Sequence, residues 1–266
     1  MTDRPHPHIL VFANQKGGVG KTSLSLNVAG ALVHMNRSAL LVDLDPQRNL
    51  SLSFPLPEDA ETVLDVFTGK APKPTKITDI LAVLPSHRDL SGLAVRMATD
   101  MELLFRLKEY LVKQTEYEFI ILDTPPTLSG LTLAAFAAAT DLVVVLSTHF
   151  YTVHGTQDLL GLYAMVNKHI NPDLHFLGAA IAICDRRTTL SREIAAIFNR
   201  DLGGKVFKIC IPRSIKVEEA QAMRKPVTYA FPFSDIAELY KELAREIQVR
   251  LYMKDNPGDG EEGGDR

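Results

Sequence analysis

The stretch ILVFANQKGGVGKTS, residues 9–23, decides the fold class. Its first four residues form an apolar run typical of a buried strand, and the residues from Ser23 onward have the apolar periodicity of a helix. Between strand and helix lies a glycine-rich loop, whose backbone N–H groups can turn inward around phosphate oxygens. The start of the helix adds a partial positive charge at the same point. This order of strand, loop and helix predicts a phosphate-binding loop, or P-loop.

Further apolar runs recur along the chain, and helix-period segments separate most of them. The predicted strands are residues 9–12, 39–42, 80–84, 119–122, 142–146, 176–183 and 206–209, and the main predicted helices are residues 23–34, 101–112, 131–139, 157–167 and 190–199. Continuous apolar strands that alternate with amphipathic helices are typical of a parallel sheet with both faces covered. We therefore predict an α/β fold: a single-domain P-loop NTPase with a twisted, mainly parallel sheet and helices on both faces.

Two segments depart from the alternating pattern. Residues 51–78 are rich in proline and polar residues, so we expect an irregular excursion at the edge of the sheet. A final helix at residues 234–252 has one apolar stripe, which predicts that it packs on the sheet. Residues 1–253 then form the domain. Residues 254–266, KDNPGDGEEGGDR, have two basic and five acidic side chains among glycines, and we expect a disordered tail.

Composition is ordinary for a soluble globular protein, with 46% hydrophobic and 23% charged residues in a chain of 266. The two cysteines, Cys184 and Cys210, lie far apart in the sequence with no metal-ligand spacing. We expect reduced, largely buried thiols, as in a cytosolic protein. The first residues contain no apolar stretch long enough for a signal peptide, so the expected location is the cytoplasm.

The P-loop supplies the first candidate site residues. Lys21 is expected to reach the β- and γ-phosphates, and the hydroxyl of Thr22 to ligate Mg²⁺. Gln15 stands where the general motif GxxxxGK[ST] has its first glycine, so the loop is the variant KGGVGKT, with an additional lysine, Lys16. The predicted phosphate-binding set is Gly17, Gly18, Val19, Gly20, Lys21, Thr22 and Ser23.

Acidic residues follow two of the predicted strands. Asp43 and Asp45 lie in LLVDLDPQRN, and Asp123 ends the strand in FIILDTPP. Ligands of open α/β sheets bind at the carboxyl ends of the strands, so these acids and the P-loop are expected in one crevice. Asp123 is the natural Walker-B acid, which holds Mg²⁺ through water or through Thr22. We expect Asp43 to support the magnesium shell.

Four stretches together, KGGVGKTS, VDLDPQRNLS, ILDTPP and IPRSIKVEEA, resemble the ParA family of partition ATPases. That family lies within the larger group that includes MinD and the nitrogenase iron protein. The resemblance covers residues 9–247 and implies a slow, partner-stimulated ATP hydrolase that uses ATP and Mg²⁺. Three departures concern partner choice: Arg48 stands where glycine is common, His149 stands where family members often carry glutamate, and EEAQAMRKPV replaces the usual sequence after IPR.

The resemblance also implies roles for single residues. Lys16 corresponds to a signature lysine that crosses the interface of an ATP-bound dimer to the partner's phosphates; the alternative is a solvated loop cation. Asp45 corresponds to the catalytic aspartate that orients the attacking water; the alternative is a structural acid that caps the loop begun by Pro46. With Lys21, these two make up the expected catalytic set. Asn49 would help to close the site, and Pro212 would lie near the adenine.

Residues 186–225 hold ten Lys or Arg against four Asp or Glu. A charge run is more often a solvated face than a binding site, but the family couples its ATP dimer to sequence-independent DNA binding, which needs clustered positive charge. The expected DNA-binding residues are Arg213 and Lys216, followed by Lys205, Lys208, Arg224 and Lys225. The implied partners are a second copy on ATP binding, non-specific DNA and a ParB-like centromere-binding protein, on the nucleoid in the cytoplasm.

Other functions within the same group remain alternatives. A ParA-like ATPase that positions a non-DNA cargo shares every motif, and only its partner distinguishes it from a plasmid or chromosome partition ATPase. A MinD-like spatial regulator on membranes predicts a basic amphipathic helix at the extreme C-terminus, whereas this chain ends in GDGEEGGDR. We therefore expect no membrane partner.

Overall fold

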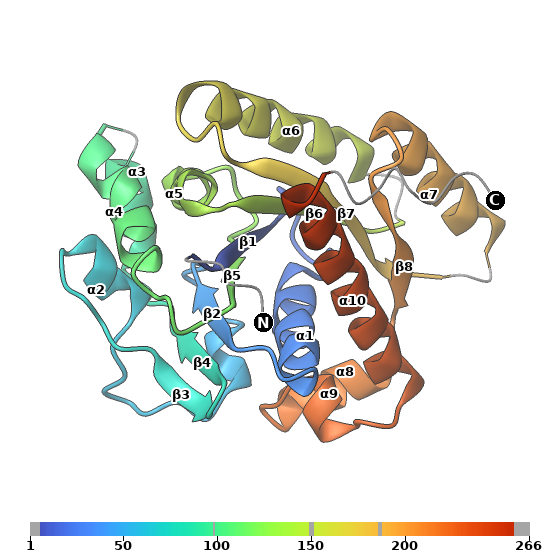
Figure 1. The fold of residues 1–266 in the computed structure, drawn as a ribbon, viewed down its shortest axis with the longest axis horizontal. Helices are drawn as coiled ribbons and strands as arrows, with labels where there is room; N and C mark the ends of the chain where they lie inside the picture. The colour runs from blue at the N-terminus through green and yellow to red at the C-terminus, as the bar shows by residue number, and fades with distance from the viewer. Residues whose placement is uncertain (1–5, 98, 149–151, 186–187, 258–266) are drawn as a thin grey trace.

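A computed structural model describes residues 6–97, 99–148, 152–185 and 188–257. Its centre is an eight-stranded sheet in the order β3-β4-β2-β5-β1-β6-β7-β8 (Figure 1). The strands are β1 (His8–Ala13), β2 (Ala39–Asp43), β3 (Thr75–Thr78), β4 (Leu81–Leu84), β5 (Phe119–Asp123), β6 (Asp141–Leu146), β7 (His175–Cys184) and β8 (Val206–Pro212). β3 pairs antiparallel with β4, whereas the other neighbouring strands are parallel. The predicted mainly parallel sheet is confirmed.

Helices cover both faces of this sheet (Figure 1). One face packs against α1 (Lys21–His34), α8 (Ile215–Ala222), α9 (Val227–Ala230) and α10 (Asp235–Asp255). The other packs against α2 (Val63–Phe67), α3 (Leu90–Arg96), α4 (Met101–Leu111), α5 (Gly130–Ala138), α6 (Thr152–His169) and α7 (Thr189–Asp201). In β1, Leu10 and Phe12 point to the first face and Ile9 and Val11 to the second. Both faces are apolar because successive strand residues alternate between two covered sides.

Residues 51–78 lie at the sheet edge, as predicted, but contain more regular structure than expected. They include a short 3₁₀ turn (Ser51–Ser53), α2 and the edge strand β3. A capping box starts α2, because the backbone N–H of Thr62 donates to Asp65 Oδ2 at 2.9 Å and the Thr62 side chain caps in return. β3 escaped the sequence analysis because its residues, TKIT, are mostly polar and none of them is fully buried.

The last helix packs on the sheet, as its apolar stripe predicts. Ile236, Tyr240, Leu243 and Ile247 of α10 are buried against α1 and the strands. The helix ends at Asp255, two residues beyond the predicted domain boundary at 253. Lys254 holds this last turn in place, because its Nζ lies 2.7 and 2.8 Å from the carboxylate oxygens of the fully buried Asp141 at the start of β6. Residues 258–266 of the predicted tail lie outside the described residues.

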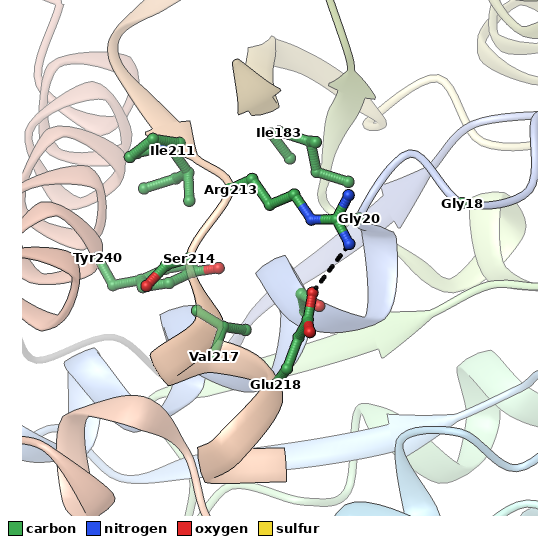
Figure 2. A pocket seen from close by; sticks show the side chains of 12 residues that line it. Gly18, Gly20, Ile183, Ile211, Arg213, Ser214, Val217, Glu218 and Tyr240 are labelled. Carbon is green, nitrogen blue, oxygen red and sulfur yellow. Dashed lines mark hydrogen bonds and ion pairs between the residues drawn. The ribbon is translucent and has the colours of Figure 1, made fainter. Parts of the chain in front are cut away.

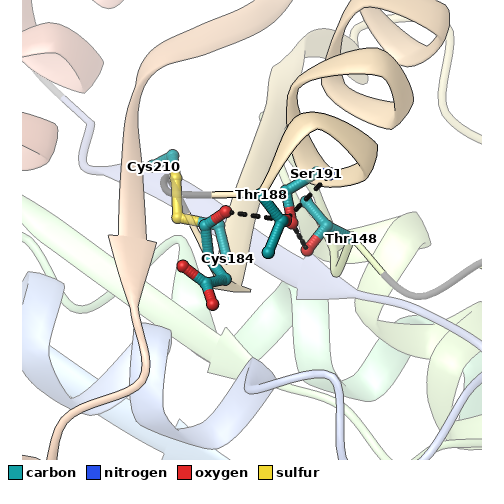
Figure 3. Close-up of a disulfide and its surroundings, with 6 residues drawn as sticks. Thr148, Cys184, Thr188, Ser191 and Cys210 are labelled. Atoms are coloured by element: carbon teal, nitrogen blue, oxygen red, sulfur yellow. Dashed lines mark hydrogen bonds between the residues drawn. A yellow bond between two sulfur atoms is a disulfide. The ribbon is translucent and has the colours of Figure 1, made fainter.

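The prediction of two reduced thiols is wrong for this structure. Cys184, at the end of β7, forms a disulfide with Cys210 of β8 (Figure 3). The two cysteines are 26 positions apart, and their Cα atoms lie 6.4 Å apart because β7 and β8 are adjacent strands. Sequence spacing could not show this pairing, because it depends on strand order.

In the part of the chain that the structure describes, no helix is both long enough and apolar enough to cross a lipid bilayer.

Candidate active site

The predicted P-loop joins β1 to α1 and adopts a conformation that needs glycine. Gly18 and Gly20 have φ values of 72° and 93°, in the left-handed region that glycine enters without steric cost. A side chain at Gly20 would also place its Cβ 2.9 Å from the Cβ of Ala182 on β7. Gly20 is therefore required both by backbone conformation and by its contact with the neighbouring strand.

Asn14 anchors the loop and was missed by the sequence analysis. It is 2% exposed; its Nδ2 donates to the backbone carbonyl of Val145 in β6, and its Oδ1 accepts the Lys16 backbone N–H at 2.8 Å. These contacts fix the first turn of the loop relative to the sheet. The available signal was a buried-strand run that ends directly in a polar side chain.

Lys21 points into the loop that precedes it. Its side chain is 6% exposed, and Nζ donates to the backbone carbonyl of Lys16 at 3.1 Å. Burial lowers the pKa of Lys21, and the charges of Asp123 and Asp45 oppose that shift. The loop therefore holds a largely desolvated cation at the start of α1, which suits a phosphate. Lys16 itself is partly exposed.

Asp123 and Thr22 lie in direct contact. Asp123 is fully buried at the end of β5; its carboxylate accepts from Thr22 Oγ1 at 2.8 Å and from Ser25 Oγ at 3.1 Å. Burial, followed by the nearby charge of Asp43, raises the pKa of Asp123 to about 7. Ser25 was not predicted, although its position three residues after Thr22 puts both hydroxyls on one side of α1.

Asp43 holds the loop that carries Asp45. It pairs in register with Asp123, and its carboxylate accepts from the Asp45 backbone N–H at 3.0 Å and from the Ser51 hydroxyl at 2.6 Å. Burial raises the pKa of Asp43 to about 6. Asp45 is 7% exposed and its Oδ1 accepts the Gln47 backbone N–H at 2.9 Å. The capping contact of the structural alternative is thus present, but it engages one carboxylate oxygen of Asp45. Asn49 is exposed on the same loop.

A cavity of about 350 Å³ extends from the P-loop to the ends of β7 and β8 (Figure 2). Its lining comes from the P-loop and α1 (Gly18, Gly20, Ser23), from the strand ends (Ala182, Ile183, Ile211, Pro212), and from Arg213, Ser214, Val217, Glu218 and Tyr240. Pro212 thus shares a cavity with the loop glycines. Arg213 and Glu218 form an exposed ion pair of 3.2 Å at this cavity. Apolar walls next to a phosphate loop provide space suited to a flat base.

The residues fit ATP and Mg²⁺ by their chemistry. The loop offers glycine N–H groups and a buried lysine for phosphates, and the Thr22 hydroxyl and Asp123 carboxylate are oxygen ligands of the kind Mg²⁺ prefers. Within the described residues no three His, Cys, Asp or Glu side chains gather as a metal site. Mg²⁺ in nucleotide sites is usually bound through one or two protein ligands together with substrate phosphates.

The six predicted DNA-binding residues are all exposed, but they lie on three segments. Lys205 precedes the edge strand β8, and Lys208 lies within it. Arg213 lines the cavity, and Lys216 lies in the first turn of α8. Arg224 and Lys225 follow α8. The structure therefore places them at the edge strand β8, at the cavity and α8, and in the turn after α8. Lys205 also contacts the carbonyl of Phe176 at 3.3 Å.

Comparison with known proteins adds independent information. A family model described as an AAA domain matches residues 7–176. The chain is 36% identical to the chromosome-partitioning ATPase Soj of Treponema pallidum, over 91% of this chain and 97% of that protein. It is 34% identical to the chromosome partitioning protein ParA of Caulobacter vibrioides, over 91% of this chain and 94% of that protein.

Among solved structures, a cobyrinic acid a,c-diamide synthase from Mycobacterium smegmatis with a bound ATP analogue and magnesium has a TM-score of 0.81 and 30% identity. The match covers 94% of this chain and 96% of the synthase. The protein is accordingly an ATP hydrolase that uses ATP and Mg²⁺. Because it is 34–36% identical to these partition proteins over 91% of its length, the chain belongs to the ParA family of P-loop ATPases.

Proposed function

We propose that this ATPase partitions DNA: it dimerises on ATP, binds DNA without sequence preference, and moves a plasmid or chromosome together with a ParB-like centromere-binding protein. The observation that carries the proposal is the 34–36% identity, over 91% of the chain, to chromosome-partitioning proteins. The solved synthase shares the fold at a lower identity of 30%. On this proposal the protein works in the cytoplasm on the nucleoid.

Within the site, the residues of the P-loop bind and orient the triphosphate. Lys21 and the N–H groups of the loop neutralise the β- and γ-phosphates, and Thr22 with Asp123 would hold Mg²⁺, which supplies charge stabilisation to the transferring phosphoryl group. Asp43 keeps Asp45 in place through its bonds to the Asp45 and Ser51 backbone. The second carboxylate oxygen of Asp45 then orients the attacking water.

The outer residues of the site have separate tasks. Lys16 reaches the phosphates of a second subunit, where positive charge delivered in trans stabilises the transition state. Its partly exposed position on the loop supports this task. Pro212 contacts the adenine from the strand ends, and Asn49 helps to close the site. The partner protein stimulates a slow basal turnover.

DNA binding rests on the exposed basic side chains of β8, α8 and the following turn. Each Lys or Arg that neutralises a phosphate releases counterions, so affinity is independent of sequence and falls with salt. A dimer joins two such edges into one longer footprint, which makes affinity rise steeply when ATP closes the dimer.

DNA binding measured with ADP, ATP and a slowly hydrolysed ATP analogue across a salt series tests the proposal. We expect binding with ATP and the analogue, weak binding with ADP, and a loss of about tenfold or more for the charge reversal Arg224→Glu/Lys225→Glu. Lys113→Glu, an exposed lysine after α4 on the other side of the sheet, is the control and retains affinity.

Absence of ATP-dependent DNA binding at low salt, in protein that still dimerises on ATP, contradicts the partition proposal and favours a ParA-like ATPase for a non-DNA cargo. A MinD-like function on membranes has no support from the last helix, because its apolar stripe is buried against α1 and the sheet.

A further inference from the structure

One buried side chain, Asn27, connects the P-loop helix to the segment that carries two of the candidate DNA-binding residues. Asn27 lies in the second turn of α1 and is 1% exposed. Its Oδ1 accepts the backbone N–H of Val227 at 2.7 Å, and its Nδ2 donates to the backbone carbonyl of Ser23 at 2.8 Å. Val227 begins α9 and Ser23 lines the nucleotide cavity, so a single amide joins the two.

A third contact of Asn27 reaches the other wall of the cavity. The hydroxyl of Tyr240, on α10, hydrogen-bonds with the Asn27 side chain, and Tyr240 is fully buried. Figure 2 shows Tyr240 among the residues that line the cavity. Asn27 therefore binds two cavity-lining residues, Ser23 and Tyr240, and one residue outside the cavity. None of the motifs assigned to ATP chemistry includes it.

Close packing reinforces the same connection. At Gly30, one turn after Asn27, a Cβ would lie 2.5 Å from Pro226 Cβ and 2.7 Å from Thr228 Oγ1. The backbone of α1 and the residues around Val227 are thus in direct contact, with no room for a side chain between them. Packed interiors transmit small displacements because they contain few voids.

The segment at the far end of this connection, residues 224–227, is named here the basic turn. Arg224 has a φ of 55°, in the left-handed region that side chains rarely adopt, and its N–H donates to the Gln221 carbonyl at 2.9 Å. The Lys225 N–H donates to the Ala220 carbonyl at 3.1 Å. Both side chains are exposed. The direction of these two side chains depends on the tight turn. The last two residues of the basic turn, Pro226 and Val227, contact α1 through Gly30 and Asn27.

We propose that Asn27 is a positioning residue that couples the nucleotide held at the start of α1 to the conformation of the basic turn. Exchange of ADP for ATP then changes how Arg224 and Lys225 are presented. The effect of this coupling on DNA binding rests on the proposed partition function, whereas the coupling between nucleotide and basic turn does not. Two sites are coupled when one element has different contacts in the two ligand states, and α1 with Asn27 is that element.

Amide hydrogen exchange of the full-length protein tests the coupling without DNA. Exchange in residues 220–231 is compared between Mg²⁺-ADP and Mg²⁺ with a slowly hydrolysed ATP analogue. Two variants disrupt the contact: Asn27→Leu loses every hydrogen bond of the amide, and the side chain of Asn27→Ser is too short to reach Val227. A third variant, Asn27→Asp, retains the oxygen that accepts the Val227 N–H. His34→Ala, at the exposed end of the same helix, is the control.

In the wild-type protein and the His34→Ala control we expect exchange in the basic turn to differ between the two nucleotides. Asn27→Leu and Asn27→Ser remove that difference while nucleotide affinity and exchange in α4, on the other face of the sheet, stay unchanged. Asn27→Asp, which keeps the acceptor for the Val227 N–H, retains the difference. A purely structural role would instead raise exchange equally in both nucleotide states. The gain in DNA affinity that ATP gives falls by about tenfold in the two disrupting variants.

The coupling is overturned if the wild-type turn exchanges equally with both nucleotides, or if Asn27→Leu and Asn27→Ser retain the difference. DNA binding measured on the same samples separates the two proposals. A wild-type turn that responds to nucleotide in protein that binds no DNA contradicts the partition function alone. ATP-dependent DNA binding that persists in both disrupting variants contradicts the role of Asn27 alone.

Discussion

In the proposed mechanism Asp45 has two functions, and each uses a different atom of its carboxylate. Its Oδ1 caps the following turn through the Gln47 N–H, and its backbone is held by Asp43 and by Ser86, whose hydroxyl donates to the Asp45 carbonyl at 2.6 Å. Neighbouring residues therefore fix the position of the side chain. A preorganised carboxylate is what orientation of a water molecule requires.

Asp45→Asn tests this division, because an amide keeps the oxygen that caps the turn and loses the charge. We expect ATP binding to remain and turnover to fall by about hundredfold or more. Binding and steady-state hydrolysis are measured on the same preparation, with Asp59→Asn, at an exposed acid, as the control. If Asp45→Asn hydrolyses ATP at the wild-type rate, Asp45 is only the cap.

Asp123 makes stability depend on pH in the metal-free protein. Its folded pKa of about 7 lies above the ordinary value of 3.8, so between these values the unfolded chain is ionised while the folded protein keeps the proton. Unfolding then releases a proton, and the contribution of Asp123 to the free energy of unfolding falls as pH rises, by up to about 1.4 kcal/mol per pH unit.

Asp123→Asn removes this contribution. We expect the difference in the free energy of unfolding, variant minus wild type, to rise between about pH 4 and the folded pKa and to level off above it. Urea unfolding in the presence of a chelator, at a series of pH values, measures the difference. A difference that does not change with pH would show that Asp123 is ionised throughout.

At the scale of elements, two long-range connections hold the strands and the last helix together. Lys254 joins the end of α10 to buried Asp141 at the start of β6, and the Cys184–Cys210 disulfide joins β7 to β8 (Figure 3). The disulfide lies next to Ile183 and Ile211, which line the nucleotide cavity. The edge of the sheet that carries this part of the cavity is therefore covalently fixed.

The disulfide leads to a prediction for the folded protein. Without reductant we expect no alkylation of Cys184 or Cys210, and after reduction we expect both to react, as measured by mass spectrometry. Reduction should lower the free energy of unfolding by about 3 kcal/mol, because it reopens a loop closed across 26 positions. The double variant Cys184→Ser/Cys210→Ser should be insensitive to reductant. Two reactive thiols in the unreduced native protein would contradict the pairing.

At the scale of the whole molecule, the predicted dimer depends on Lys16. The P-loop is held within its own subunit by three contacts: Lys21 to the Lys16 carbonyl, Thr22 to Asp123, and Asn14 to β6. The Lys16 side chain, which the resemblance to ParA assigns to a partner's phosphates, is partly exposed on this loop. A charge at that place suits a contact with a second subunit.

Lys16→Ala should abolish ATP-dependent dimerisation and lower turnover by about a thousandfold, because charge supplied in trans is worth that much in related phosphoryl transfers. Light scattering with ATP and with ADP measures the dimer, and ATP binding by the monomer should persist. Lys73→Ala, at an exposed loop lysine, is the control. If the Lys16→Ala protein dimerises and hydrolyses ATP normally, the side chain is a solvated cation.

Much of the fold could be predicted because a buried parallel strand is apolar over its whole length. The seven predicted strands correspond to β1, β2 and β4 to β8. α8 and α9 were missed because they bury few side chains, only Ala220 in α8 and Val227 and Thr228 in α9. Local apolar periodicity is weak wherever a helix covers the sheet with so few residues.

The sequence by itself determined the phosphate loop, the acids at the strand ends and the family, because each is encoded in consecutive residues whose chemistry is local. Tertiary structure decided the rest. Asn14, Ser25 and Asn27 find their partners 131, 98 and 200 positions away, and Cys184 finds Cys210 only through the adjacency of β7 and β8. Such contacts depend on the order of strands and the packing of helices, which no local pattern specifies.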